Sequence, residues 1–454
     1  MLPHLPELGI GIVWWPGLGA ITAEPGLIDV VEIEPQAFFL EMQQRGRVLC
    51  PDAVVDELRA LPQPKLLHGV GTPVGSPRNL DPRQLPLLRR LRDALQPAWC
   101  SEHLACQRAA TPLGQSHTGF FLPPRQTDAG VARAATAITM LRGALDAPLL
   151  IETGTNYVRP RQDELADGAF VARIADTADC GILLDLHNAW TNERNGRQPV
   201  REFVASLPAE RVVEIHVAGG FELDGYWLDA HSGQVPPPVL DLLAELLPAL
   251  PAVTAVVFEI LPDHIPRFGV DRIAEQLRRL RGVWDARAQR ARERQPRPAA
   301  APFAASDSMP SPVEWEDTLG SLVIGQNPDS SLARELAADP GLPLLRRLVG
   351  EFRAGAVAAT LPRTTRMLAR RHGEHHLRAL LLEHARHHGP EPFSRTEALQ
   401  FARTLRRWLA DDATALAVLD NEVAQQHDWL RAVAAELDSA PWPMAPISST
   451  SCDR

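Results

Sequence analysis

Over the first 282 residues, short apolar runs alternate with longer segments in which apolar positions recur at helical spacing. The short runs are rich in Val, Ile and Leu, which is typical of buried β-strands, whereas the longer segments have the periodicity of amphipathic helices. The expected strands are Leu8–Val13, Val30–Ile33, Lys65–Val70, Ala98–Leu104, Leu149–Thr153, Gly181–Leu186, Val212–Val217 and Ala255–Ile260. The expected helices between them include Pro51–Ala60, Gln84–Leu95, Gly130–Leu145, Gly168–Ala178, Pro237–Leu247 and Val270–Arg281.

This alternation predicts an α/β fold of the (β/α)8 TIM-barrel type for residues 1–285, because such barrels usually take about 250 residues. An open doubly wound sheet would also alternate strands with helices. However, no GxGxxG follows the first strand, as a dinucleotide-binding fold would require. Gly69, Gly71 and Gly75 do not have the spacing of a phosphate-binding loop either. The barrel is therefore the expected fold.

The second half of the chain has a different pattern. Residues 286–312 are rich in Ala, Pro, Arg and Ser without apolar periodicity, which indicates a flexible linker. Residues 313–446 then show apolar positions at i, i+3, i+4 and i+7, so we expect a smaller all-α domain without strands. Residues 447–454 are expected to form a disordered tail.

Composition limits the class of protein. A length of 454 residues exceeds what one core usually supports, in agreement with two domains. The net charge of −10 argues against a nucleic-acid partner. The five cysteines form no CxxC pair and suggest no disulfide framework, which fits a reducing cytoplasm. No apolar run approaches the roughly 20 residues of a membrane helix, so we expect a cytoplasmic protein without a membrane partner.

Polar side chains stand at the carboxyl ends of most expected strands. In a barrel these positions lie on one rim, where the catalytic residues of such folds are found. They are Glu32 and Glu34, His68, Glu102 and His103, Glu152, Asp185 with His187 and Asn188, His216, Asp229 and His231 in the following loop, and Glu259.

The stretch 212–235 shows why these residues suggest a metal. His216 lies near the end of a strongly apolar strand, and Asp229 and His231 follow two residues apart, so that in extended chain they point the same way. Converging imidazole and carboxylate groups suit a divalent metal. For this stretch alone, a hydrogen-bonded core histidine and a loop aspartate would be an equally good interpretation.

The whole rim favours the metal. Burying a charge costs several kcal/mol unless it is paired or metal-bound, so many carboxylates and imidazoles on one rim require cations. Scattered salt bridges and helix caps are the alternative explanation. About eight ligands exceed what one ion needs, and oxygen and nitrogen donors without thiolate suit iron, manganese or zinc.

An ordered set of motifs carries a family resemblance: HGVGTP, SEHLA, IETGTNY, LLDLHN, EIHVAGG, LDAHSG and FEI. Over about residues 5–285 the chain resembles the multinuclear non-heme iron-dependent oxidative enzymes, the barrel family that includes the methanobactin-biosynthesis oxidase. The resemblance implies two or three irons, dioxygen as co-substrate, and a ribosomally made precursor peptide as substrate. The modified residue in this family is often a cysteine.

Position by position, the resemblance implies iron ligands at His68, His103, Glu152, Asn188, His216, Asp229, His231 and Glu259. Asp185, His187 and Glu102 are the expected catalytic residues, with Asp185 as a ligand or a partner of ligands and Glu102 more distant from the metal. Many family members carry Asn-Asn where this chain has His187-Asn188. If the strand continued, Asp185 and His187 would share one face and Asn188 would oppose them. Whether His187 adds a nitrogen ligand stays open.

The helical half contains seven histidines, which raises the question of a second metal site. No HExxH occurs, and Arg371, Arg378 and Arg386 are interleaved with the histidines, so a solvated polar face is the favoured interpretation. Family barrels often work with a separate partner that captures the precursor peptide. We expect this role to be fused here in the helical domain, where it would raise the effective peptide concentration at the rim, or to belong to a separate partner protein.

Two other classes of function compete with the oxidase. One is a metal-dependent hydrolase or isomerase of the trizinc-endonuclease or sugar-isomerase barrel type, although the negative charge disfavours a DNA substrate. The other is a non-catalytic scaffold in which only the helical half acts, which the complete ligand set disfavours.

Overall fold

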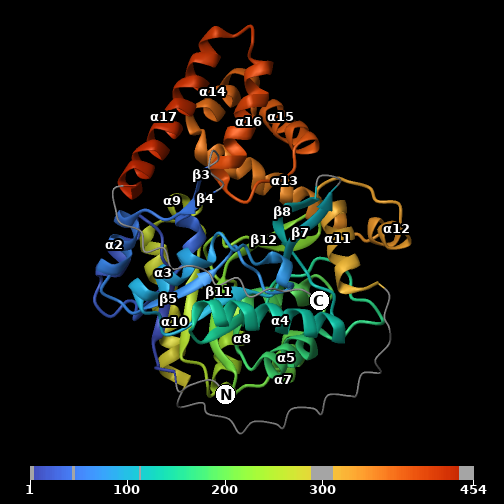
Figure 1. Cartoon of the computed structure of the whole chain (residues 1–454). Helices are drawn as coiled ribbons and strands as arrows, with labels where there is room; N and C mark the ends of the chain where they lie inside the picture. The colour runs from blue at the N-terminus through green and yellow to red at the C-terminus, as the bar shows by residue number, and fades with distance from the viewer. Residues whose placement is uncertain (1–4, 43–46, 112–113, 288–309, 439–454) are drawn as a thin grey trace.

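A closed barrel of parallel strands forms the body of the protein in the computed structural model, which describes residues 5–42, 47–111, 114–287 and 310–438 (Figure 1). Around the barrel the strands follow the order β1-β14-β11-β10-β9-β6-β5-β2. Their bounds are β1 Gly9–Val13, β2 Val30–Ile33, β5 Lys65–Gly69, β6 Cys100–His103, β9 Leu149–Glu152, β10 Gly181–Asp185, β11 Val212–Ala218 and β14 Ala255–Glu259. The expected fold class is confirmed, and each expected strand is present with shifts of a few residues at its ends.

The apolar runs become strands because the barrel buries them on both faces. Every residue of β11 and of β14 is buried, and the register pairs Ala218 on β11 with Glu259 on β14. Functional side chains at the ends of these two strands therefore begin at the same height on the rim.

Helices cover the outside of the barrel. Their bounds are α1 Gly19–Ala23, α2 Asp52–Ala60, α3 Leu85–Leu95, α4 Asp128–Leu145, α5 Asp167–Ala178, α6 Leu186–Arg194, α7 Val200–Ser206, α8 Pro237–Leu246, α9 Ile265–Phe268 and α10 Val270–Ala286. α3 is typical, because Leu87, Leu88, Leu91 and Leu95 form its buried face. The expected helices are all present, whereas α6 and α7 were not expected from the sequence.

Three antiparallel hairpins follow barrel strands at their carboxyl ends and were not expected either. They are β3–β4 (Leu40–Met42 and Arg47–Leu49), β7–β8 (Cys106–Thr111 and Gly114–Leu122) and β12–β13 (Gly220–Leu223 and Tyr226–Asp229). Since they follow β2, β6 and β11, they raise the wall of the carboxyl rim.

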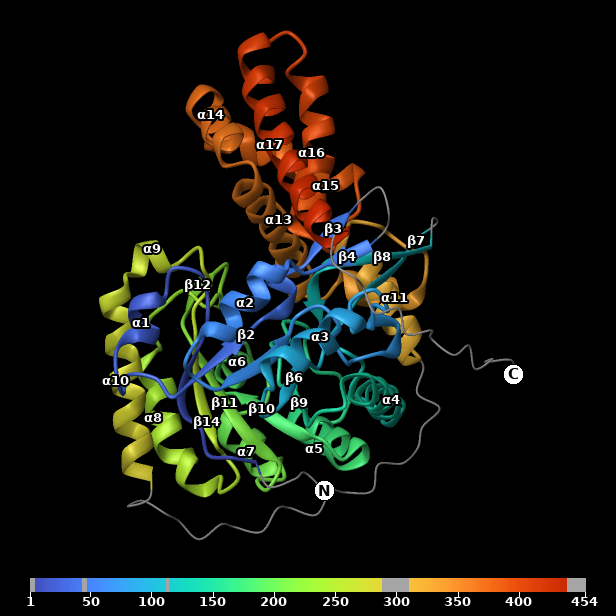
Figure 2. The same cartoon turned by 60° about the vertical axis from the view of Figure 1, so that its left-hand side comes forward.

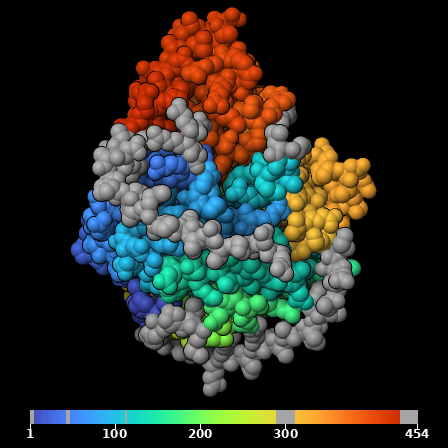
Figure 3. Space-filling model, in the orientation of Figure 1, coloured from blue at the N-terminus to red at the C-terminus, as the bar shows by residue number. Residues whose placement is uncertain are grey.

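The C-terminal region is helical, with no strand in the residues described from 310 to 438, as expected. Its helices are α11 Pro312–Val323, α12 Ser331–Ala337, α13 Gly341–Thr360, α14 Pro362–His372, α15 Glu374–His387, α16 Ser394–Trp408 and α17 Ala413–Asp438. Two views show helices α13–α17 standing above the carboxyl rim, and the space-filling view shows them projecting from the barrel body (Figures 1, 2 and 3). Most of the predicted linker (288–309) and the predicted tail lie outside the described residues.

This region contains two separate apolar cores. The second half of α13 joins α14, α16 and α17 around Leu361, Leu368, Phe401 and Leu419. The helices α11 and α12 and the first half of α13 instead share a core with barrel loops. Its members include Cys106, Leu122, Tyr157, Val158 and Leu228 of the barrel with Trp315, Leu319, Leu332, Leu336, Leu342 and Leu345. The first helices are therefore part of the rim, and only the later ones form a distinct bundle.

None of the described helices is long and apolar enough to cross a membrane.

Candidate metal centre

Histidine and carboxylate side chains from the strand ends gather inside the carboxyl rim. Four groups of them place their ligand atoms within 4.8 Å of one another. Neighbouring groups share members, so the groups form one continuous cluster. The groups are His68, His103 and Glu152; Glu152, Asp185, His216 and Glu259; Asp185, Asp229 and His231; and Glu32, Glu214 and His216.

The first group comes from the ends of β5, β6 and β9. Glu152 Oε2 lies 3.1 Å from His68 Nε2 and 2.8 Å from His103 Nε2. The other ring nitrogens face Ser101 Oγ at 2.9 Å and the Gly69 carbonyl at 3.0 Å. The Gly69 carbonyl can only accept, so His103 Nδ1 donates; in the neutral imidazole that a metal binds, Nε2 then keeps its lone pair for the centre of the group, as in many metal-binding histidines.

The second group lies between β9, β10, β11 and β14. His216 is fully buried, and its Nδ1 lies 3.1 Å from Glu259 Oε1. Asp185 Oδ2 makes no hydrogen bond although it is buried. Glu152 belongs to both the first and the second group, so this carboxylate lies where it could bridge two ions.

The third group combines Asp185 with Asp229, at the end of β13, and His231, in the loop that follows. His231 Nε2 lies 3.0 Å from Asp229 Oδ1 and 3.4 Å from Glu259 Oε2. The sequence correctly predicted that Asp229 and His231 lie together, but the predicted extended backbone is wrong, because His231 has a φ of 46°. A left-handed turn, rather than strand alternation, directs the imidazole to the carboxylate.

The expected strand alternation at Asp185, His187 and Asn188 is also wrong. β10 ends at Asp185, whose side chain accepts the Asn188 N–H at 2.8 Å and caps α6. His187 and Asn188 therefore lie in the first helical turn, where they no longer alternate between two faces. Asn188 is buried and its Oδ1 makes no hydrogen bond, so this oxygen remains free to act as a ligand.

His187 uses both ring nitrogens within the protein. The Trp227 indole donates to His187 Nε2 at 3.1 Å, so Nε2 carries no proton. Nδ1 consequently holds the proton and donates to Asp229 Oδ1 at 2.9 Å. His187 is thus placed to orient Asp229 rather than to bind an ion.

Glu102 is placed beside the cluster with its oxygens in use. Its Oε2 accepts from the backbone N–H and the hydroxyl of Thr72 at 3.0 and 2.7 Å, and its Oε1 accepts from His103 N–H at 2.9 Å. The carboxylate therefore fixes the loop after β5 and the backbone of a ligand histidine.

Sequence reasoning missed Glu214, and it noted Glu32 only as a strand end. Both are fully buried, and they lie 3.6 and 2.9 Å from His216 Nε2. The Trp99 indole donates to Glu214 Oε2 at 2.7 Å. Glu214 could have been found, since it stands two residues before His216 and so faces the barrel interior with it.

Burial and crowding shift the acidity of these groups strongly. Burial, then repulsion from Asp229, Glu259 and Glu152, raises the pKa of Asp185 well above its ordinary value. Burial and the neighbouring Glu214 raise the pKa of Glu32 to about 7. Burial opposes ionisation of Glu152 too, but His103 and His68 hold its pKa well below the ordinary value. Neighbouring groups with such unequal pKa shifts are typical of functional sites.

The residues fit metal ions, because buried polar atoms without hydrogen bonds are rare and these converge on one space. Oxygen and nitrogen donors without a thiolate match iron, manganese or zinc. The buried atoms of the three groups and of Asn188 that make no hydrogen bond, although several lie at ion-pair distance from one another, are Glu152 Oε2, Asp185 Oδ2, Asn188 Oδ1, His216 Nδ1, His231 Nε2 and Glu259 Oε2.

Comparison with solved structures finds sugar epimerases at low similarity. An L-ribulose 3-epimerase aligns with 64% of this chain and 100% of its own length at 12% identity and a TM-score of 0.38. A D-allulose 3-epimerase from Methylomonas sp. aligns with 63% of this chain and 99% of its own length at 14% identity and a TM-score of 0.41.

Sequence comparison is more specific. A UPF0276 protein of Anaeromyxobacter sp. (strain Fw109-5) is 33% identical over 58% of this chain and 87% of its own length. A UPF0276 protein of Caulobacter vibrioides (strain NA1000 / CB15N) is 29% identical over 59% of this chain and 90% of its own length. The family model described as "RiPP precursor modification enzyme MbnB/TglH/ChrH" matches residues 9–282, which is the whole barrel. This chain therefore belongs to the MbnB/TglH/ChrH family of enzymes that modify the precursors of ribosomally made peptides.

Proposed function

We propose that the protein is a multinuclear iron- and dioxygen-dependent oxidase that modifies a residue, expected to be cysteine, of a ribosomally made precursor peptide. The observation that carries the proposal is the sharing of carboxylates between ligand groups. Glu152 belongs to the first and second groups and Asp185 to the second and third. Carboxylates shared in this way would hold neighbouring ions within one cluster, as a multinuclear centre requires.

In this proposal the first three groups each hold one ion. His68 and His103 would hold the first ion with Glu152, and His216 and Glu259 the second with Glu152 and Asp185. Asp229, His231 and Asn188 would complete the third with Asp185. When bound, iron supplies the redox chemistry with dioxygen as co-substrate, and the protein supplies ligand geometry and orientation.

The surrounding residues would keep the ligands in place. His187 donates to Asp229, Glu102 holds the His103 backbone, and Glu32 contacts His216 Nε2. Partners of this kind fix ring orientation and ligand basicity, and their loss typically weakens metal binding about 10–100-fold.

We also propose that the C-terminal helices recognise the precursor peptide in cis, in place of a separate partner protein. Helices α13–α17 stand above the rim that holds the cluster (Figures 1 and 2). They expose apolar side chains that a peptide could cover, namely Phe352, Leu382, Trp408 and Trp429.

The test is anaerobic purification of the full chain, followed by metal analysis and by incubation with candidate cysteine-containing precursors with and without oxygen. The proposal predicts more than one iron per chain and an oxygen-dependent mass change of the peptide. Activity that persists without oxygen, or with zinc in place of iron, would instead indicate the metal-dependent hydrolase or isomerase.

A further inference from the structure

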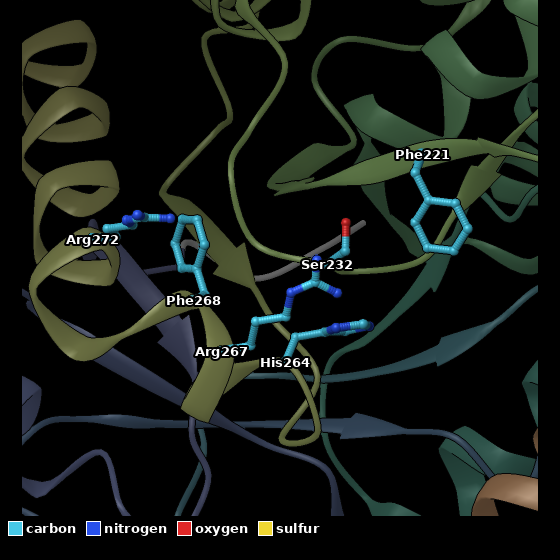
Figure 4. A pocket seen from close by; sticks show the side chains of 6 residues that line it. All are labelled: Phe221, Ser232, His264, Arg267, Phe268 and Arg272. Carbon is cyan, nitrogen blue, oxygen red and sulfur yellow. The ribbon is translucent and has the colours of Figure 1, made fainter. Parts of the chain in front are cut away.

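A pocket of about 480 Å³ lies beside the cluster of ligand side chains at the rim (Figure 4). Its walls come from β12, from the loop after β13, and from α9 and the start of α10. The lining residues are Phe221, Ser232, His264, Arg267, Phe268 and Arg272.

The pocket shares its wall with the third ligand group. Ser232 directly follows His231, so their Cα atoms are about 3.8 Å apart. The N–H of Leu261 donates to the His231 carbonyl at 3.1 Å, and the His264 N–H donates to the Leu261 carbonyl at 3.0 Å. A bound peptide that places one residue at the third ligand group can therefore place a second residue, only a few positions away in its sequence, in this pocket.

A glycine shapes the apolar side of the pocket. Gly233 has a φ of 124°, and a Cβ at this position would lie 2.6 Å from the Phe268 ring. The absence of a side chain lets Phe268 lie directly against the loop that carries His231. The Phe221 ring lies on the opposite side of the lining, with Ser232, Arg267 and His264 between the two rings in this view (Figure 4), so aromatic surface flanks the polar groups on both sides.

The cations of the pocket are available to a ligand. Arg267 and Arg272 are exposed, and among the described residues neither has a carboxylate within ion-pair distance. Further along α10, the helix of Arg272, Arg278 is paired with Glu24 and Arg279 with Glu275, each at 2.7 Å. The Arg272 guanidinium lies 5.9 Å from the Phe268 ring centroid, which leaves its edge free to donate hydrogen bonds.

We propose that this pocket binds a carboxylate of the precursor peptide, a few residues from the modified position. The two guanidinium groups would pair with the carboxylate, the geometry that arginine matches best, and the Ser232 hydroxyl and His264 imidazole would add hydrogen bonds. The aromatic walls would hold the apolar part of the same segment. The inference rests on the proposed function, because that function makes a peptide the substrate. The carboxylate is either an Asp or Glu side chain or the peptide's own C-terminus.

Three small probes separate these sources in fluorine NMR titrations of the full, metal-loaded chain. N-acetyl-4-fluorophenylalanine offers an α-carboxylate, and N-acetyl-aspartyl-4-fluorophenylalaninamide offers only a side-chain carboxylate. N-acetyl-4-fluorophenylalaninamide offers none. We expect at least one carboxylate probe to bind about tenfold more tightly than the neutral amide, because charge-assisted hydrogen bonds are about twice as strong as neutral ones.

The variant Arg267→Gln/Arg272→Gln should lose that difference while keeping its metal content and thermal stability. The matched control Arg278→Gln/Arg279→Gln removes the same charge from α10, outside the pocket lining, and should keep the tenfold preference. Because both variants retain the cluster, binding of a probe carboxylate to metal cannot produce the difference between them. Equal binding of all probes, an unchanged preference in the pocket variant, or no binding at millimolar concentration would overturn the proposal.

The pocket and the oxidase activity can be confirmed or contradicted independently of each other. Loss of preference only in the pocket variant, in a protein that lacks oxygen-dependent activity, would support the pocket and contradict the oxidase. Oxygen-dependent peptide modification with no carboxylate preference would support the oxidase and contradict the pocket.

Discussion

The two halves of the molecule are both rich in histidine but use it in opposite ways. At the rim, His68, His103 and His216 are buried or nearly so and face carboxylates. In the helical bundle, His375 and His376 are exposed, and no metal-type cluster is found among the bundle residues that the structure describes. Parallel strand ends converge on one space, whereas a helix surface spreads its side chains apart. Histidine residues therefore indicate a metal site only where the fold brings several ligand side chains to one place.

The one deeply buried bundle histidine sharpens the contrast. Burial, then the neighbouring His388 and Arg353, lowers the pKa of His384 to about 4. At the rim, burial has the same sign, but Glu152 and Glu102 outweigh it and raise the pKa of His103 well above its ordinary value. The first environment favours a neutral core imidazole, and the second favours a cation, either a proton or a metal ion.

The largest effect is expected for Glu152, a carboxylate shared by two groups. Glu152→Ala should remove ligands from two ions at once and lower activity and metal affinity by more than about 100-fold, beyond the loss typical of partners that only contact ligands. Metal analysis and precursor mass spectrometry measure both. The control His375→Ala/His376→Ala changes histidines of the bundle and should leave metal content unchanged. Equal metal loss in both variants would contradict the conclusion that the rim, and not the helical bundle, binds the metal.

A smaller effect is expected for Glu32, which contacts His216 from the side away from Glu259. Glu32→Gln keeps the shape of the side chain but removes its negative charge, so metal affinity should fall about 10–100-fold. Competition with a chelator measures the affinity. The exposed Glu275→Gln should behave as wild type, and an unchanged affinity in Glu32→Gln would show that Glu32 does not support the ligand.

Metal affinity should also rise with pH. The raised pKa of His103 means that, without metal, the protonated imidazole stabilises the fold below the ordinary histidine pKa. That contribution disappears as the pH rises through the raised value. A metal needs the neutral imidazole, so affinity should increase about tenfold per pH unit for each proton displaced. Titrations with ferrous or manganous ion between mildly acidic and mildly basic pH measure it, and a flat or falling affinity would contradict the pairing with Glu152.

The smallest expected effect concerns the junction between the halves. A Cβ at Gly341, at the start of α13, would lie 2.0 Å from the Tyr157 carbonyl oxygen, and the Tyr157 hydroxyl accepts the Asp229 N–H at 3.3 Å. Gly341→Ala should therefore cost about 1–3 kcal/mol of unfolding free energy through overpacking, with a small loss of metal affinity. The control Gly355→Ala on the same helix meets nothing within 4 Å and should be neutral or stabilising. Equal denaturation midpoints for the two variants would show that the helices do not support the rim.

The sequence predicted the barrel well, because continuous apolar runs mark strands that are buried on both faces. It also placed His68, Glu152 and Glu259 on one rim, since residues at strand ends need no loop geometry to be located. It failed where local hydrogen bonds change the backbone: the Asp185 cap turns His187 and Asn188 into a helix. The left-handed conformation of His231 and the shared core around Tyr157 depend on tertiary contacts that periodicity does not encode.

The most direct test is a crystal structure of the anaerobically purified protein with anomalous data at the iron edge. We predict two or three iron peaks inside the rim, between the imidazoles of His68, His103, His216 and His231. Glu152 should touch two of them, and Asp185 should touch two when all three are present. A single peak, peaks outside the barrel, or ligand side chains that point away from the peaks would contradict a shared cluster.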